Sequence, residues 1–136
     1  MSDWNDQVIE EFRANGGKVR AFARQPLLLL THVGAKTRTE RTNPLAYFRD
    51  GDRWVVVASK GGAATNPDWY HNLVTHPRAS IEVGTETIDV TAELPSPEER
   101  NRLWRTITSQ NPAFAEYEAK TSRTIPVVVL KPRSDE

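Results

Sequence analysis

Apolar side chains near the start of the chain recur every three or four residues, with charged and polar residues between them. This spacing predicts an amphipathic helix with a single apolar face. Gly16-Gly17 follows the pattern and predicts that the helix ends there. The apolar positions of this first helix are Trp4, Val8, Ile9 and Phe12.

Short apolar runs and alternating patterns predict strands along most of the remaining chain. The runs at 27–33 (LLLLTHV) and 126–130 (PVVVL) are apolar enough for buried strands, and a loop at 34–42 follows the first of them. The segments 44–50 and 53–59 flank Asp50-Gly51-Asp52, which is typical of a hairpin turn. The segments 79–84 and 86–94 alternate apolar and polar residues and predict a second hairpin with one solvated face.

Helix start and stop signals mark three further helical segments. Asn66 is placed to cap a helix that has Pro67 at its first position and ends before Pro77. Ser96 and Glu99 form a capping-box pattern before the apolar positions of a second helix, Leu103, Trp104 and Ile107. The segment from Pro112 to Lys120 predicts one more short helix.

The resulting order is α-β-β-β-α-β-β-α-α-β, with two hairpins and no regular βαβ alternation. This order argues against a doubly wound sheet and predicts a mainly β fold, an antiparallel barrel with flanking helices. The chain has 136 residues, a length that fits one domain with a single core.

Charge and composition narrow the classes of partner. Lys+Arg and Asp+Glu both number 18, so the chain as a whole has no electrostatic reason to bind nucleic acid. The absence of cysteine excludes disulfides, cysteine-ligated metal centres and thiol nucleophiles. The acidic, amphipathic N-terminus lacks the regions of a signal peptide, and we expect a cytoplasmic protein.

Several common catalytic and nucleotide-binding motifs are missing from the sequence. The three histidines do not have the spacing of metal ligands on one helix face, so we expect structural or exposed roles for His32, His71 and His76 and no metal site. There is no G-x-S-x-G elbow, no complete P-loop and no G-x-G-x-x-G. These absences argue against a hydrolytic triad and a Rossmann nicotinamide site.

Two loops carry the remaining candidate chemistry. The first, 34-GAKTRTERTNP-44, has three cations within six residues, and the second, 59-SKGGAATNP-67, joins Lys60 and two glycines to a helix start. Exposed amides and the positive end of a helix favour an anion at such a place. A solvated, well-capped turn is the alternative interpretation. Core packing is likewise the alternative for Trp69, and a surface or packing role is the alternative for Tyr117.

Taken together, these segments resemble the deazaflavin-dependent nitroreductase family, whose members use reduced coenzyme F-420 and also reduce quinones. The resemblance covers about Val19 to Pro132 and is carried by GAKTRTERTNPL, ASKGGAATNPDWYHNL, HPRASIEV and SRTIPVVVL, in the family's order. It implies a six-stranded antiparallel split β-barrel. Family members carry an arginine where this chain has Ala35, and Arg38 is expected to take its place.

The resemblance also implies where the coenzyme binds. Its flat deazaflavin ring needs an apolar slot, and its phosphate and polyglutamate tail need cations. Lys36 and Arg41 are expected to meet the phosphate or tail, and Lys60 the phosphate region. The full implied cofactor-binding set is Lys36, Thr37, Arg38, Arg41, Asn43, Pro44, Ala58, Ser59, Lys60, Gly61, Gly62, Asn66, Pro67 and Trp69.

The implied reaction is hydride transfer from the reduced coenzyme to a hydrophobic acceptor, a quinone or a nitroaromatic compound. Ser59 and Tyr117 are the implied hydroxyl donors to the oxygen that gains negative charge. A flavin-mononucleotide- or haem-binding relative and a non-enzymatic F-420 carrier are the alternatives. A homodimer and contact of the first helix with the membrane or the acceptor are open, although core packing of that helix is favoured.

Overall fold

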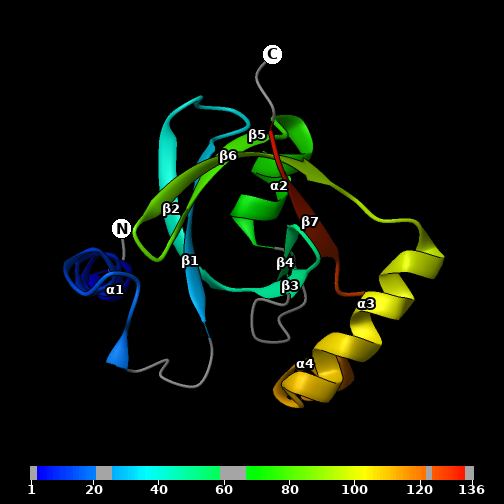
Figure 1. Cartoon of the computed structure of the whole chain (residues 1–136). Coiled ribbons are helices and arrows are strands. Elements are labelled where there is room, and N and C mark those ends of the chain that lie inside the picture. The colour runs from blue at the N-terminus through cyan, green and yellow to red at the C-terminus, as the bar shows by residue number, and fades with distance from the viewer. Residues whose placement is uncertain (1–2, 21–25, 59–66, 122–123, 134–136) are drawn as a thin grey trace.

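The computed structural model describes residues 3–20, 26–58, 67–121 and 124–133. These residues form a seven-stranded sheet and four helices (Figure 1). The helices are α1 (Asp3–Ala14), α2 (Asp68–Thr75), α3 (Pro97–Gln110) and α4 (Ala113–Ala119). The strands are β1 (Leu27–Val33), β2 (Glu40–Ala46), β3 (Phe48–Asp50), β4 (Arg53–Val57), β5 (Arg78–Val83), β6 (Glu86–Glu93) and β7 (Val127–Pro132).

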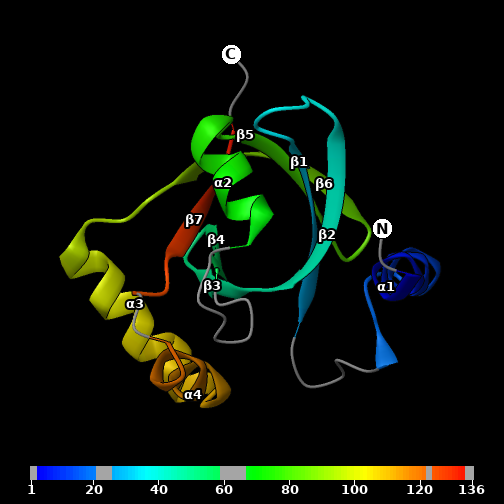
Figure 2. The same ribbon diagram turned by 180° about the vertical axis from the view of Figure 1, so that it is seen from behind.

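Every strand pair in the sheet is antiparallel, in the order β2-β1-β5-β6-β7-β4-β3. The sheet curls around α2, while α1 lies on one side of the barrel and α3 and α4 lie on the other (Figures 1 and 2). The two edge strands, β2 and β3, are separated in sequence only by Tyr47. The antiparallel barrel with flanking helices is therefore confirmed.

The strand count differs from the prediction, because the predicted strand 44–50 is two strands. Ala46 makes the last β2 pair with Leu27 of β1, and Phe48 then pairs with Val55 of β4. Between them, the Tyr47 N–H donates to the Pro26 carbonyl at 3.2 Å. The chain thus passes from one edge of the sheet to the other. The loop after β1 is also shorter than predicted, since β2 begins at Glu40.

Strand alternation divides the core into layers. In β1, Leu28 and Leu30 pack inside the barrel, whereas Leu27 and Leu29 pack against α1. In β7, alternate valines face the barrel interior and the α3–α4 layer. Both faces of these strands are covered, which explains why their sequences are continuous apolar runs.

Helix α1 uses its apolar face for the core. Val8 and Phe12 are buried with Leu27 and Leu29 of β1. Burial of each such side chain contributes about 1.5–3 kcal/mol relative to leaving it exposed. This packing agrees with the favoured prediction for the first helix, and these two side chains are not available to a membrane surface.

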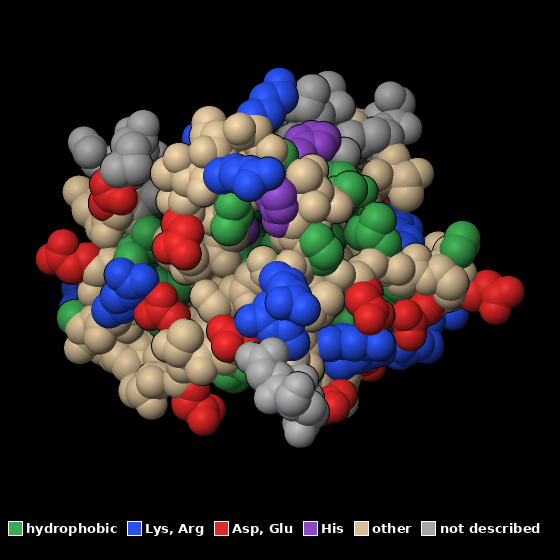
Figure 3. Space-filling view, turned by 90° about the horizontal axis from the view of Figure 1, so that it is seen from above, with side chains coloured by type: hydrophobic (Ala, Val, Ile, Leu, Met, Phe, Trp, Pro, Cys, Tyr) green, Lys and Arg blue, Asp and Glu red, His purple; other side chains and the backbone are tan. Residues whose placement is uncertain are grey.

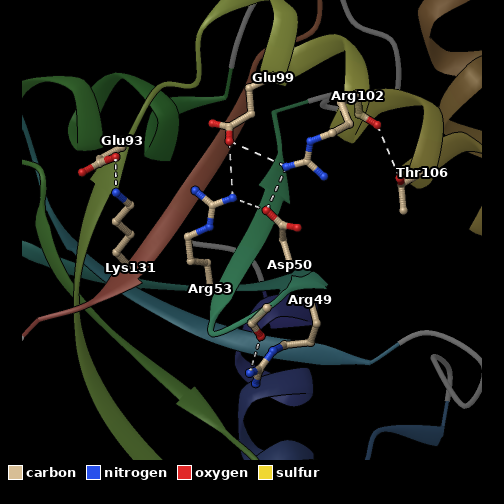
Figure 4. A network of polar contacts seen from close by, with 9 residues as sticks. Arg49, Asp50, Arg53, Glu93, Glu99, Arg102, Thr106 and Lys131 are labelled. Carbon is tan, nitrogen blue, oxygen red and sulfur yellow. Dashed lines mark hydrogen bonds and ion pairs between the residues drawn. The ribbon is translucent and has the colours of Figure 1, made fainter.

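Helix α3 begins at the Ser96 cap that its sequence predicts, and ion pairs join its first turns to the β3–β4 hairpin. The Ser96 hydroxyl accepts a hydrogen bond from the Glu99 N–H at 3.2 Å. The Glu99 carboxylate lies 3.7 Å from Arg102 and 3.5 Å from Arg53 of the β3–β4 hairpin. Asp50 accepts hydrogen bonds from both arginines, which lower the pKa of its carboxyl (Figure 4). This network joins the hairpin to the α3–α4 layer.

Candidate functional site

The loop between β1 and β2 is a tight turn. The Gly34 N–H donates to the Thr39 carbonyl, and the Arg38 N–H donates to the Gly34 carbonyl, both at 2.9 Å. A Cβ on Gly34 would lie 2.5 Å from the Thr37 hydroxyl oxygen, so only glycine fits without movement. Arg38 has φ 58°, a left-handed conformation that costs a non-glycine residue about 1–2 kcal/mol. The turn is compact and locally strained.

This turn presents its charged side chains to solvent. Lys36 and Arg38 in the turn and Arg41 near the start of β2 are exposed. Thr37 is also exposed, and its hydroxyl accepts a hydrogen bond from the Thr39 N–H at 3.3 Å. The face of the molecule seen from above carries Lys and Arg side chains interspersed with Asp and Glu side chains (Figure 3). Exposed cations at this place can form charge-assisted hydrogen bonds with an anionic ligand.

A chain of buried polar groups ties the turn to α2. The Ala35 N–H donates to Asn72 Oδ1 at 2.9 Å, and Asn72 Nδ2 lies 3.1 Å from His32 Nδ1. His32 Nε2 lies 2.6 Å from Asn43 Oδ1 on β2. Burial lowers the pKa of His32, although the Asn43 bond and Asp68 oppose the shift and Arg41 adds to it.

The chain of polar groups includes His32, for which a structural or exposed role was expected and which is buried and hydrogen-bonded, and Asn72, which the sequence did not single out. A signal for His32 was present in the sequence. In the run LLLLTHV, strand alternation places it on the same face as Leu28 and Leu30, which face the barrel interior. Asn72 gave no comparable signal, because its partner is 40 residues away in the sequence.

The second predicted loop is described only at its two ends. Ala58 is fully buried, and its N–H donates to the Pro126 carbonyl at 3.0 Å. Pro67 is buried at the N-cap of α2, and Trp69 packs in the barrel interior with Leu73. The predicted contacts Ser59, Lys60, Gly61, Gly62 and Asn66 lie outside the described residues.

Pro44 and Tyr117 belong to different parts of the fold. Pro44 is half-buried in β2, opposite Leu29 of β1. Tyr117 is half-buried on α4 and makes an edge contact with Phe114 at 5.6 Å between ring centroids. Tyr117 and Val57, which precedes Ser59 by two residues, pack against the same outer cluster. Tyr117 therefore lies in the helical layer on the β4 side of the barrel.

An apolar depression opens beside α2. It has a volume of about 190 Å³ and is lined by α2 and by the end of β6, including Tyr70, Val74 and Leu94. Val74 and Leu94 are 54% and 56% exposed, and they are the large hydrophobic residues that the described part of the chain leaves on its surface. A second depression of about 370 Å³ shares Tyr70 and Leu94 and reaches Pro126, the hydrogen-bond partner of Ala58.

The described residues also set limits on other chemistry. Within them, no group of three or more His, Asp or Glu side chains is arranged to hold a metal ion. None of the helices they form is long and apolar enough to cross a membrane.

A curled antiparallel barrel with exposed cations beside the β1–β2 turn and an apolar depression beside α2 defines a split-barrel protein. The sequence profile of the F420H(2)-dependent quinone reductase family matches residues 4–132. The chain belongs to this family, whose coenzyme is F420.

Individual relatives agree with this assignment. An F420H(2)-dependent quinone reductase of Mycobacterium tuberculosis strain H37Rv is 42% identical over 127 residues, which cover 90% of this chain and 85% of that protein. A solved F420-H2 dependent reductase has a TM-score of 0.71 and 36% identity, covering 78% of this chain and 94% of its own.

Two further structures bear on assembly and on the alternative ligands. A solved domain-swapped dimer has a TM-score of 0.75 and 31% identity, covering 93% of this chain and 95% of its own. A haem storage protein of Vibrio cholerae has a TM-score of 0.62 but only 15% identity, covering 93% of this chain and 89% of its own. The haem protein therefore shares the fold alone.

Proposed function

We propose that the chain transfers a hydride from reduced coenzyme F-420 to a quinone. The family match over residues 4–132 carries this proposal, because it spans both candidate loops. The turn at 34–39 supports it physically. Its exposed cations suit the phosphate and polyglutamate tail of the coenzyme, and its backbone is held in place by Asn72.

The anionic end of the coenzyme is assigned to the basic turn. Lys36, Arg38 and Arg41 would supply charge, and Thr37 would supply a hydroxyl. Asn43 uses its carbonyl oxygen for His32, which leaves its NH₂ group as the donor for the coenzyme. Pro44 is assigned to the adjoining wall of the site. Lys60, Gly61 and Gly62 would meet the phosphate region.

The ring end is assigned to the start of α2 and the end of β4. The residues proposed there are Ala58, Ser59, Asn66, Pro67 and Trp69. Burial of Ala58, Pro67 and Trp69 makes this end apolar, which suits a flat ring.

Bound F-420 supplies the hydride, and the protein supplies alignment, exclusion of water and hydrogen-bond donors. Ser59 and Tyr117 are proposed to donate a hydrogen bond to the acceptor oxygen that gains negative charge. A phenol hydroxyl can act as a hydrogen-bond donor. No covalent nucleophile is required of the chain.

The acceptor is proposed to be hydrophobic, either a quinone or a nitroaromatic compound. The apolar depressions beside α2 support this choice, because they expose Val74 and Leu94 and approach Pro126 at the end of β4. An apolar ligand that covered both side chains would gain about 25 cal/mol for each Å² it removed from water.

The last two points concern the oligomeric state of the chain and its contact with the membrane. The domain-swapped dimer among the solved relatives supports a homodimer. Contact with the membrane through α1 has less support, because Val8 and Phe12 already pack against β1.

A coenzyme titration tests the proposed function. Purified protein is mixed with F-420, binding is followed by fluorescence, and oxidation of the reduced coenzyme is then followed with menadione. We expect saturable binding at micromolar coenzyme and turnover of the quinone. Binding without turnover of any acceptor would favour a carrier, whereas a flavin or Soret spectrum in the purified protein would favour a flavin- or haem-binding relative.

A further inference from the structure

Two buried polar side chains lie between the barrel interior and the basic turn. His32 and Asn72 are the buried polar or charged residues in the described part of the chain, and they are 1% and 7% exposed. A buried polar group is costly unless it is hydrogen-bonded, and these two bond to each other. Their second bonds reach Ala35 in the turn and Asn43 on β2.

One backbone group determines the direction of every hydrogen bond in this chain. The Ala35 N–H can only donate, so the amide atom of Asn72 that faces it must be Oδ1. Asn72 Nδ2 then faces His32 Nδ1, which must accept. His32 therefore carries its proton on Nε2 and donates to Asn43 Oδ1.

A protonated His32 is incompatible with this arrangement. A proton on Nδ1 would face the NH₂ group of Asn72, and rotation of the Asn72 amide would then bring its NH₂ group against the Ala35 N–H. Either geometry sets two donors against each other. The turn keeps its bond to α2 only while the imidazole is neutral.

We propose that His32 and Asn72 are positioning residues for coenzyme binding, which hold the turn at 34–39 so that its cations meet the anionic part of F-420. The proposal rests on the proposed function. Neither residue needs to touch the coenzyme. They order the turn before the coenzyme binds. The entropy cost of ordering the turn therefore does not weaken binding.

The test compares F-420 with its riboflavin-like fragment, which has the deazaflavin ring and ribityl chain but no phosphate or glutamates. Asn72→Leu removes the bond to Ala35. We expect its dissociation constant for F-420 to rise about tenfold, equivalent to about 1.4 kcal/mol, while that for the fragment stays within about twofold of wild type. An unchanged constant for F-420, or an equal rise for both ligands, would overturn the positioning role.

Two further variants separate positioning from general stability. His32→Asn places an amide oxygen near the position of Nδ1, and it should restore most of the affinity that His32→Leu loses. Ile107→Val removes a buried methyl group from α3 and costs about 0.5–1.5 kcal/mol of stability. It should leave both affinities unchanged. If Ile107→Val weakens F-420 binding as much as Asn72→Leu does, the loss reflects stability and the proposal fails.

If Asn72→Leu does not fold, the pH dependence of ligand binding by the wild-type protein tests the proposal instead. The charged groups around His32 are Arg41 of β2, Asp68 of α2, and Glu40, Arg78, Asp89 and Arg133 around the depression beside it. The preference for F-420 over the fragment should fall at acidic pH, once the pH reaches the lowered pKa of buried His32 and the imidazole is protonated. A preference that stays constant with pH would overturn the proposal.

The same titrations separate this proposal from the proposed function. A wild-type protein that binds neither F-420 nor the fragment contradicts the function itself. A wild-type protein that binds F-420 tightly, with Asn72→Leu and His32→Leu variants that bind it equally well, contradicts only the positioning role. His71 lies on α2 and His76 follows its last residue. The His32→Asn variant retains both, so any pH dependence that remains in its binding comes from groups other than His32.

Discussion

The imidazole Nε2 of His32 lies 2.6 Å from the side-chain oxygen of Asn43, across the β1–β2 strand pair. The His32 ring is almost completely buried, and burial is the main reason that its pKa is lowered. The folded protein therefore favours the neutral imidazole. The conformation of the basic turn depends on that neutral state through Asn72 and Ala35.

The lowered pKa of His32 predicts how stability changes with pH. Above about pH 6.5, the ordinary histidine value, the group is neutral in both states and contributes no pH dependence. Below that value the unfolded chain binds a proton that the folded chain resists, so the free energy of unfolding falls until the pH reaches the lowered folded value. Urea unfolding between about pH 5 and 8 measures this, and His32→Asn should flatten the profile.

Removing cations from the turn should weaken coenzyme binding without unfolding the protein. Lys36 and Arg41 are exposed, so alanine at either position should change stability by less than about 0.5 kcal/mol. We expect the dissociation constant for F-420 to rise about three- to tenfold per cation, with a weaker dependence on salt. Arg105→Ala, on the exposed face of α3, is the matched control. Equal effects of all three substitutions would contradict the assignment of the turn.

Arg38 allows backbone strain to be separated from charge. Its φ of 58° is easy for glycine and costly for other residues. Arg38→Ala keeps the strain and Arg38→Gly relieves it, so the glycine variant should be more stable than the alanine variant by up to about 1 kcal/mol. Both variants lose the cation and should bind F-420 equally weakly. Chemical denaturation and a coenzyme titration on the same samples measure the two effects.

The exposed position of Leu94 predicts a specificity for long quinones. Lysine at this position places a charge in the apolar depression beside α2. We expect KM to rise about tenfold for a quinone with an isoprenoid tail, and to change little for menadione, which has no such tail. Thr87→Lys, at the other end of β6, is the control for added charge. The outcome that contradicts this prediction is a Leu94→Lys variant with both KM values unchanged that has lost the ability to dimerise in a sedimentation experiment. That result would assign this surface to self-association.

Much of the fold followed from local patterns in the sequence. The four consecutive leucines of β1 predicted a strand buried on both faces, and Asp50-Gly51 marked the β3–β4 turn, where Gly51 has φ 66°. Ser96 and Glu99 predicted the start of α3, and the Ser96 hydroxyl makes the expected bond. Such features depend on residues close together in the sequence, and a single sequence therefore reveals them.

The missed features depend on contacts between distant residues. The division of the predicted strand 44–50 at Tyr47 results from the closing of the barrel, because Ala46 and Phe48 belong to the strands at opposite edges of the sheet. Asn72 looked like an ordinary helical residue because its partners, His32 and Ala35, belong to another part of the chain. Sequence spacing could identify the cations of the turn, but it could not identify the groups that hold the turn in place.

A single-turnover reaction is the most direct test of F-420-dependent quinone reduction by this chain. Protein in excess over reduced F-420 is mixed rapidly with menadione, and reoxidation of the coenzyme is followed at increasing protein concentrations. We expect a rate that saturates with protein. At protein concentrations below saturation, we expect this rate to fall strongly in the Lys36→Ala and Lys60→Ala variants. A rate equal to that of coenzyme and quinone without protein, at every protein concentration, would contradict the central claim that this chain is an F-420-dependent quinone reductase.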